Sequence, residues 1–329
     1  MTHRVVVTGA TGQIGRPLCQ ALLAAGQEEV VVFSRDPARA QRSVPGAAAY
    51  LAWSADDLPG ECLDQLAAAD AVVHLAGGPL FDGRRHSRAD VLAESQRRAA
   101  VLRQLAAALG RSSRRPGVLV AASSVGYYGY GHRDPGSVDE TSPAGADWWG
   151  RDSAMIEQAA LAAQAHGVRT VPLRTGYVLT AGRLATQLAP FRRHLGGWIG
   201  TGRGWIPWIH IADEVGIITF ALRHAGVTGP VNATAPAPAR ARDFARALGR
   251  ATGRAAWLPV PTPLVRMGLG VVTDILVRGQ PVVPAAVSAL GYQFRFPGLA
   301  DALADLLSRP GDPARSGQSR PSGASGAPR

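Results

Sequence analysis

Residues 5–15 read Val5-Val6-Val7-Thr8-Gly9-Ala10-Thr11-Gly12-Gln13-Ile14-Gly15. The β-branched run at 5–7 is typical of a buried parallel strand. A glycine turn follows at once, and residues 16–25 form a helix-like stretch that ends at Gly26, a typical C-cap residue. Strand, glycine turn and helix in this order are the physical setting of a dinucleotide-phosphate site.

Each glycine of the turn has a distinct expected role. Gly9 allows a tight turn, Gly12 lets the backbone approach a pyrophosphate, and Gly15 lets the helix pack close to the strand. Free amide groups and the positive end of the helix dipole then face the anion. The spacing is GxxGxxG rather than GxGxxG, and the alternative is a purely structural strand-to-helix turn. Its place between a strand and a helix favours the cofactor site.

Composition sets the outer limits of the fold and the location. The 329 residues allow one large α/β domain, a smaller lobe and a sizeable core. The mean hydropathy is +0.02, and no apolar run approaches the length of a membrane helix. Because the N-terminus enters a strand directly, we expect no secretory signal and a cytoplasmic location. Cys19 and Cys62 are too few for a disulfide framework or a zinc cluster, so no metal site is predicted.

The formal net charge of +11 comes from arginine alone, because the sequence contains no lysine. The arginines are scattered, with short pairs such as Arg84-Arg85 and no clustered basic face with interleaved aromatic residues. We therefore expect a small-molecule substrate and no nucleic-acid or membrane partner. The sequence does not distinguish a monomer from a homodimer.

Short strand-like runs alternate with helix-like stretches along the first 180 residues, which predicts a doubly wound parallel α/β sheet of the Rossmann type. The helix after the fifth strand is expected at about 152–166, and the long helix at 88–109 is expected to stop at Gly110. We predict a dinucleotide-binding domain at 1–230, a smaller substrate lobe at 231–308 and a disordered tail at 309–329. The expected strands lie at 5–7, 29–33, 50–52, 71–75, 118–122 and 168–174.

The end of the second strand bears on the choice of cofactor. NAD sites usually place an acidic residue there, whereas NADP sites place a small polar residue and an arginine that binds the 2′-phosphate. Ser34 and Arg35 fit the second pattern, although Asp36 lies one residue later. NADP(H) is therefore favoured over NAD, and the alternative is that Arg35 is a solvated charge.

A glycine-rich segment with three tryptophans spans about 182–213. Such a segment seldom serves packing alone, so we interpret it as a substrate lid or cleft wall. Trp205, Trp208 and His210 are its candidate substrate contacts, with His210 as a contact or an acid.

The chain resembles the extended short-chain dehydrogenase/reductases, in particular atypical epimerase-family proteins with a small C-terminal domain of uncharacterised function. The resemblance covers roughly residues 4 to 307. It rests on Val7 to Gly12, Ser34-Arg35, His74 to Gly77, Ser123 to Gly129, Leu173 to Gly176, Trp208 to Asp213, Gly279 to Pro284 and Gly291 to Phe294.

This resemblance implies roles for particular residues. Arg35 would bind the 2′-phosphate, and Ala76 and Gly77 would flank the adenosine ribose or the nicotinamide side. Ser124 would hydrogen-bond the reacting carbonyl or hydroxyl. Arg174 is a further candidate cofactor-binding residue. The pyrophosphate would be lined by Gly9, Thr11, Gly12, Gln13, Ile14 and Gly15.

The chain departs from standard relatives at their Tyr-x-x-x-Lys pair, where a lysine lowers the pKa of a phenol that transfers the proton. Trp149 aligns with the tyrosine and Ser153 with the lysine, and neither can do that chemistry. Tyr127 and Tyr128 are candidate proton donors, although an unassisted phenol with a pKa near 10 is a poor base at neutral pH. Arg174 or Arg151 is the candidate cation beside them; packing in the cleft wall is the alternative role for both phenols.

Two functions therefore remain open. The first is an NADP(H)-dependent, epimerase-like oxidoreductase acting on a small polar carbonyl or sugar-nucleotide-like substrate. The second is a non-catalytic NADP(H)-binding redox sensor or scaffold. The missing Tyr/Lys pair favours the second, whereas the glycine- and tryptophan-rich segment favours the first.

Overall fold

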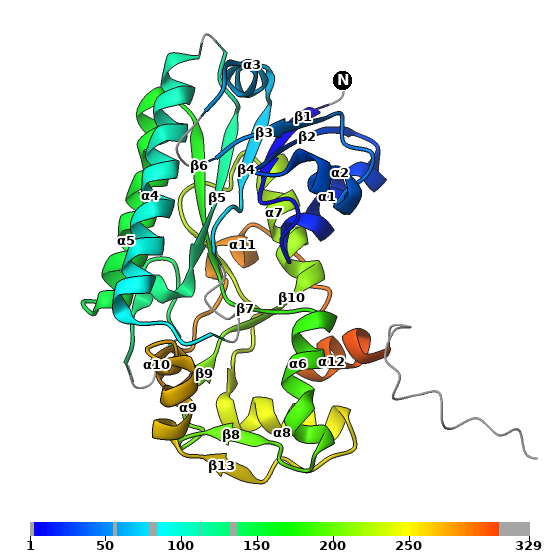
Figure 1. The fold of residues 1–329 in the computed structure, drawn as a ribbon, viewed down its shortest axis with the longest axis vertical. Helices are drawn as coiled ribbons and strands as arrows, with labels where there is room; N and C mark the ends of the chain where they lie inside the picture. Colours follow the sequence, from blue (N-terminus) through cyan, green and yellow to red (C-terminus); the bar gives the residue numbers. More distant parts are fainter. Residues whose placement is uncertain (1–2, 55–57, 79–83, 113, 132–136, 309–329) are drawn as a thin grey trace, which may run out of the picture.

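Seven parallel strands form the central sheet of the computed structural model, which describes residues 3–54, 58–78, 84–112, 114–131 and 137–308 (Figure 1). Their order is β11-β6-β5-β4-β1-β2-β3, so the chain starts in the middle of the sheet and winds out to both edges. This confirms the predicted doubly wound sheet. The strands are β1 (His3–Thr8), β2 (Glu28–Ser34), β3 (Ala49–Ala52), β4 (Ala71–His74), β5 (Val118–Ser124), β6 (Arg169–Thr175) and β11 (Val231–Ala233).

Helices cover both faces of the sheet, and the valine run explains why. Val5 and Val7 join one hydrophobic cluster while Val6 joins the other, since successive side chains of a strand point to opposite faces. Both faces must therefore be buried, as a continuous β-branched run requires. One layer contains α3 (Gly60–Ala68), α4 (Arg88–Arg111) and α5 (Trp148–Leu161), and the other contains α1 (Gly15–Ala25), α2 (Pro37–Ser43) and α7 (Ile211–Arg223).

Three helix boundaries differ from the prediction. Helix α5 begins at Trp148 rather than near residue 152, because the Asp147 carboxylate accepts hydrogen bonds from the amides of Trp149 and Gly150. The residues from 162 onward form a separate 3-10 turn, η2 (Ala162–His166). Helix α4 continues past Gly110 to Arg111.

A smaller lobe lies at the lower end of the molecule in Figure 1. Strands from both sides of residue 230 build it, since β13 pairs with β8 and β12 pairs with β9. Conversely, β11 lies beyond residue 230 but pairs with β6 in the central sheet, so the two lobes are interleaved in the sequence. The elements around this lobe are α6 (Ala181–Arg192), β8 (Gly197–Ile199), β9 (Trp205–Ile206), β12 (Ala239–Arg240), α8 (Ala241–Ala251), β13 (Leu258–Val260), α9 (Thr262–Leu269) and α10 (Thr273–Arg278).

Five further elements complete the described part of the fold. Strand β7 (Tyr177–Leu179) pairs in parallel with β10 (Trp208–His210), which leads directly into α7. The others are η1 (Val125–Tyr128), α11 (Ala285–Ala289) and α12 (Leu299–Ser308). The predicted tail at 309–329 lies outside the described residues. Within the described ranges, no helix combines the length and apolarity that crossing a bilayer requires.

Candidate functional site

The glycine turn after β1 is built so tightly that side chains are excluded from it. Gly9 has φ of +72°, and a Cβ there would lie 2.7 Å from the backbone carbon of Leu75. A Cβ on Gly15 would lie 2.2 Å from the Gly9 carbonyl oxygen. These contacts bring the start of α1 against the turn, where the Gly12 amide bonds the Gly9 carbonyl at 3.0 Å and the Arg16 amide bonds the Gly12 carbonyl at 3.1 Å. The amides of residues 13–15 lie between these two bonds and make this helix N-terminus, at the carboxyl end of β1, a candidate anion site.

The exit of β4 is fixed beside this turn by a buried contact between two strands. The Thr8 hydroxyl lies 2.9 Å from His74 Nδ1 and also accepts a hydrogen bond from the Ala76 amide. Burial lowers the pKa of His74 to about 3, with the nearby Arg98 charge contributing, so the imidazole is neutral at pH 7. His74 is 2% exposed and is thus the packed core histidine that its position within a strand predicts. The contact positions Ala76 and Gly77 over the sheet.

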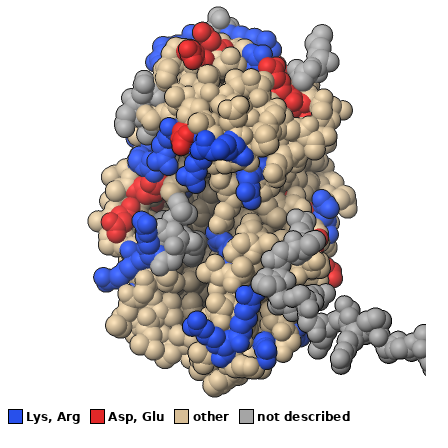
Figure 2. All heavy atoms as spheres, turned by 45° about the vertical axis from the view of Figure 1, so that its right-hand side comes forward, with Lys and Arg blue, Asp and Glu red and all other residues tan. Residues whose placement is uncertain are grey.

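A first cavity of about 410 Å³ lies between the glycine turn and the end of β2. Ser34, Arg35, Arg39 and Trp53 line it, and the Trp53 amide donates to the Ser34 carbonyl at 3.0 Å. The Asp36 carboxylate, which complicated the sequence interpretation, accepts a hydrogen bond from the Arg39 amide and caps α2. The face drawn in Figure 2 is hollowed near its middle, and arginine side chains gather around the hollow.

A second cavity of about 490 Å³ continues from the glycine turn toward the smaller lobe. It shares Gly9, Gly12, Gly77 and Arg98 with the first, so both open onto the same turn. Both volumes fall in the range of about 300–1,000 Å³ typical of ligand sites. Among the described lining residues of the second cavity, the charged ones are Arg98 and Arg183, and no carboxylate lines it.

The smaller lobe closes the far wall of the second cavity. Trp205 and Ile206 of β9, together with Ile275 and Leu276 of α10, line this wall. The Arg240 guanidinium lies 4.3 Å from the Trp205 ring centroid and holds the indole in place. The cavity therefore has a polar floor at the strand ends and an apolar cover.

Ser124 lies on that floor, at the last position of β5. Its Oγ accepts a hydrogen bond of 3.0 Å from the Gly126 amide. Because this amide occupies an acceptor site of the oxygen, the hydroxyl hydrogen is left to donate. Ser124 can thus polarise a carbonyl oxygen placed in the second cavity.

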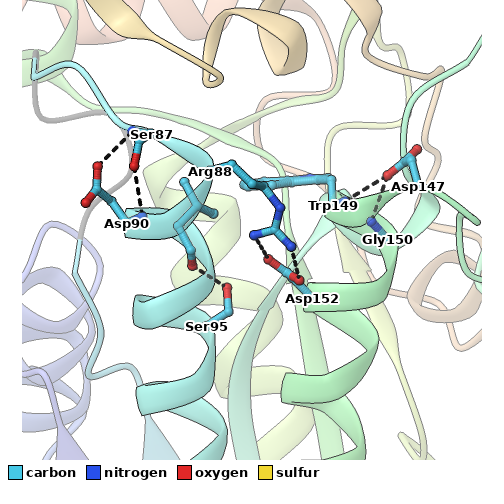
Figure 3. A network of polar contacts seen from close by, with 9 residues as sticks. Ser87, Arg88, Asp90, Ser95, Asp147, Trp149, Gly150 and Asp152 are labelled. Atoms are coloured by element: carbon cyan, nitrogen blue, oxygen red, sulfur yellow. Dashed lines mark hydrogen bonds and ion pairs between the residues drawn. The ribbon is translucent and has the colours of Figure 1, made fainter.

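Trp149 lines the same cavity from α5, and Figure 3 shows how its helix is held. Besides the Asp147 cap, Asp152 forms a bidentate ion pair with Arg88 of α4, with two N–O distances of 2.9 Å. A Cβ on Gly126 would lie only 1.6 Å from the Trp149 indole nitrogen, so the ring packs directly on the turn after Ser124. One helical turn later, Ser153 is buried and lines neither cavity.

Tyr127, Tyr128 and Arg174 lie outside both cavities. The Tyr128 hydroxyl donates to Asn232 Oδ1 at 2.7 Å and accepts from Arg174 at 2.9 Å, and burial raises the pKa of this phenol to about 12. Arg174 is 2% exposed and pairs with Glu157 through two 2.9 Å contacts, while the Tyr127 ring lies 3.5 Å beneath its guanidinium. This arrangement is a buried structural network. It argues against Tyr127 or Tyr128 as proton donors and against Arg174 as a cofactor contact.

The predicted substrate residues divide in the same way. Trp205 lines the second cavity, as described above. Trp208 is 0% exposed and donates its indole hydrogen to the Ala237 carbonyl, which makes it a core residue. His210 is also 0% exposed; its Nδ1 accepts from the Ala212 amide to cap α7, and its Nε2 lies 3.3 Å from Asp305. The structure thus places Trp208 and His210 away from any substrate in the cavity.

Every predicted cofactor-binding residue except Arg174 lines one of the two cavities. These residues are Gly9, Thr11, Gly12, Gln13, Ile14, Gly15, Ser34, Arg35, Ala76 and Gly77.

Several lining residues were not predicted as site residues, among them Arg39, Arg98, Thr175 and Tyr177. Arg98 lies in the wall between the two cavities and donates to the Ala122 carbonyl at 3.2 Å. Its signal was present, because it follows Ser95 at the helical spacing of the buried face of α4.

Comparisons with known proteins agree with this geometry. Residues 5–233 match the model of the NAD dependent epimerase/dehydratase family, and residues 260–306 match a domain of unknown function, DUF1731. The human epimerase family protein SDR39U1 is 35% identical over 93% of this chain and 100% of its own length. A chloroplastic homologue of SDR39U1 from Arabidopsis thaliana is 34% identical, over 92% of this chain and 86% of its own.

Solved structures lead to the same result. A crystal structure of human SDR39U1 (isoform 2) with NADPH matches with a TM-score of 0.77 at 35% identity, covering 92% of this chain and 98% of that one. A nucleoside-diphosphate sugar epimerase from Corynebacterium glutamicum matches with a TM-score of 0.72 at 27% identity, covering 93% of this chain and 58% of that one. The fold and the cradle are those of NAD(P)-binding proteins of the short-chain dehydrogenase/reductase type. The chain belongs to the NAD-dependent epimerase/dehydratase family.

Proposed function

We propose that this protein binds NADP(H) across the two cavities and acts as an oxidoreductase on a small polar carbonyl or alcohol substrate. The observation that carries the proposal is the continuous lining from Arg35 and Arg39, past the glycine turn, to Ser124. The similar human protein was solved with NADPH, which supports the same choice of cofactor here.

The two arginines give the physical reason for preferring NADP(H). A 2′-phosphate between Arg35 and Arg39 would receive charge-assisted hydrogen bonds from both guanidinium groups, whereas NAD(H) offers only a hydroxyl there. The pyrophosphate would lie on the amides of residues 13–15, and Arg98 would add a permanent positive charge beneath it. When bound, the nicotinamide supplies or accepts a hydride.

The second cavity supports a substrate next to the nicotinamide. The Ser124 hydroxyl would donate to the substrate oxygen, and the apolar wall of Trp205, Ile275 and Leu276 would exclude water. Since the described lining residues include two arginines and no carboxylate, the site favours neutral or anionic polar substrates over cations. A sugar-nucleotide-like molecule or a small acidic carbonyl compound fits this chemistry.

A second function rests on a different observation. The sequence contains no lysine, and Trp149 and Ser153 occupy the aligned positions of the usual proton-transfer pair. Cofactor binding without turnover would make the protein a redox sensor or scaffold. In that case the second cavity receives a partner or remains filled by the cofactor alone.

Calorimetric titration combined with a turnover assay separates these functions. We expect NADPH to bind more tightly than NADH, and a carbonyl panel to include a compound that oxidises NADPH, with turnover reduced in Ser124→Ala. Tight NADPH binding without turnover on any compound of the panel would favour the sensor. Equal affinity for NADPH and NADH would contradict the NADP(H) assignment.

A further inference from the structure

Two hydroxyl groups lie side by side at the carboxyl edge of the sheet. Ser124 ends β5 and Thr175 ends β6, and the two residues are register partners in the parallel β5–β6 ladder. Their predecessors Ser123 and Arg174 both bond Glu157 of α5. Because side chains alternate along a strand, Ser124 and Thr175 point to the opposite face. Both line the second cavity.

A buried carboxyl group stands directly behind Thr175. Glu214, in the first turn of α7, is 0% exposed, and its Oε1 lies 2.8 Å from Thr175 Oγ1. Its Oε2 is buried without a hydrogen-bond partner among the described residues. Such a carboxyl has a hydrogen bond on one side only and is therefore costly to ionise.

The charged neighbours do not offset that cost. Arg174, adjacent in sequence to Thr175, is committed to Glu157 on the other face of the sheet. Tyr292 faces α7 but donates its hydroxyl hydrogen to Asp213, the residue before Glu214, whose own carboxylate is bonded to the amides of Arg295 and Phe296. Burial raises the pKa of Glu214 to about 8, so the group carries a proton at neutral pH.

We propose that Thr175 and Glu214 form a proton relay into the second cavity, which takes the place of the tyrosine–lysine pair that this chain lacks. The inference rests on the proposed oxidoreductase function. Thr175 is the residue that meets the substrate oxygen, beside Ser124, and Glu214 acts through it. The 2.8 Å contact serves both directions, since a carboxylic acid donates to the hydroxyl and a carboxylate accepts from it.

The step balances as an ordinary carbonyl reduction. The carbonyl carbon receives the hydride that NADPH supplies, and the C=O π pair takes the Thr175 hydroxyl proton to form the alcohol. Thr175 recovers a proton from the Glu214 carboxylic acid, which is left as a carboxylate. Water re-protonates Glu214 by the reverse path through Thr175 after the product leaves.

Tyr177 is the competing donor, because it also lines the second cavity. Its hydroxyl accepts a hydrogen bond from Gln187 of α6, and burial raises the pKa of the phenol. We favour Thr175 because it is the register partner of Ser124, lines the same cavity and contacts the buried Glu214 carboxyl. The variant Tyr177→Phe removes the phenol hydroxyl and therefore tests whether Tyr177 is the proton donor.

A spectroscopic test reads the relay without any substrate. In protein labelled with ¹³C-glutamate, difference infrared spectra should show a protonated carboxyl band at pH 7 that is missing from Glu214→Gln. The band should convert to carboxylate as the pH rises through about 8, and shift in Thr175→Val and on addition of NADP⁺. Thr170→Val, a buried threonine at the other end of β6, should leave the band in place. An ionised Glu214 at pH 7, or a band indifferent to Thr175→Val, overturns the relay.

A kinetic test reads the same groups during turnover. Thr175→Val should lower kcat/KM by about 10²-fold or more, the usual size of a general-acid contribution, while Thr175→Ser restores most of it. In the parent, kcat/KM for reduction should fall above pH 8 because the relay needs the protonated acid, and Glu214→Gln should be slower and lack this limb. Thr170→Val should match the parent. Loss of turnover in Tyr177→Phe with full activity in Thr175→Val assigns the proton to the phenol and overturns the relay.

Loss of cofactor binding and absence of a proton relay give different experimental results. If the parent and all variants fail to bind NADPH, the proposed function is wrong. A different result is equal NADPH binding by the parent and by Thr175→Val, with a Glu214 infrared band that responds neither to this substitution nor to NADP⁺. In that case only the relay is wrong.

Discussion

Replacing Gly15 with alanine tests the glycine cradle at its tightest point. The added Cβ would lie 2.2 Å from the Gly9 carbonyl oxygen and 2.8 Å from Ala10 Cα, and both neighbours are backbone atoms that cannot rotate away. Ordinary contacts between such atoms are about 3.5 Å, so the turn and the start of α1 must separate by roughly 1 Å. Overpacking of this kind costs about 1–3 kcal/mol.

The same displacement moves the amides that would bind the pyrophosphate. We expect Gly15→Ala to lower the melting temperature by a few degrees and to weaken NADPH binding at least about tenfold, which corresponds to 1.4 kcal/mol. Thermal unfolding with and without NADPH, together with calorimetric titration, measures both effects.

Gly60→Ala provides the matched control. Gly60 begins α3, and nothing lies within 4 Å of a Cβ added there. This variant should keep the parent's NADPH affinity and lose no stability, since alanine favours a helix over glycine. If Gly15→Ala also binds NADPH as tightly as the parent, the cradle does not hold the pyrophosphate and the reasoning is refuted.

Three further predictions concern other parts of the site. Arg35→Ser and Arg39→Ser should each weaken NADPH binding by about 10- to 100-fold and leave NADH binding unchanged, as calorimetry with both cofactors would show. Arg42 is an exposed arginine that shares α2 with Arg39 and lines neither cavity, so Arg42→Ser should change neither affinity. Tyr128→Phe should lower the free energy of unfolding by about 1–3 kcal/mol, because Asn232 and Arg174 lose a buried partner, with the NADPH affinity unaltered; weakened NADPH binding at unchanged stability would return Tyr128 to the site. The raised pKa of Glu214, about 8 against 4.5 for an ordinary glutamate, means that the folded state binds the extra proton between these values, so stability falls as pH rises from about 5 to 8. In Glu214→Gln this fall in the free energy of unfolding should be smaller by an amount on the order of a few kcal/mol. Denaturant unfolding at several pH values measures the difference, and the same pH dependence in parent and variant would mean that Glu214 is ionised in the folded protein.

Local sequence signals were sufficient for the sheet and the cradle. The valine run, the glycine turn and the helix that follows lie within residues 5–25, so short-range sterics determine both the elements and their function. The end of β2 is equally local, and the sequence correctly placed Arg35 where it lines the first cavity. Arg39 was not predicted, although the Asp36-Pro37 pair is a typical start of a helix and indicates the helix that carries Arg39.

The polar side chains near the reacting end depend on long-range packing instead. Tyr128 reaches Asn232 across 104 residues of sequence, and the loop order alone cannot tell that its hydroxyl points into the core. His210 and Trp208 resemble cleft residues in a glycine-rich segment, yet β10 pairs with β7 and buries both. Thr175 and Glu214 become neighbours only when α7 packs on β6.

A crystal structure of the protein with NADPH tests the central claim most directly. We predict that the pyrophosphate lies on the amides of residues 13–15, that the 2′-phosphate lies between Arg35 and Arg39, and that the nicotinamide faces Ser124 and Thr175 across the second cavity. A cofactor bound with its adenosine phosphate away from both arginines, or with its nicotinamide outside the second cavity, would contradict the account.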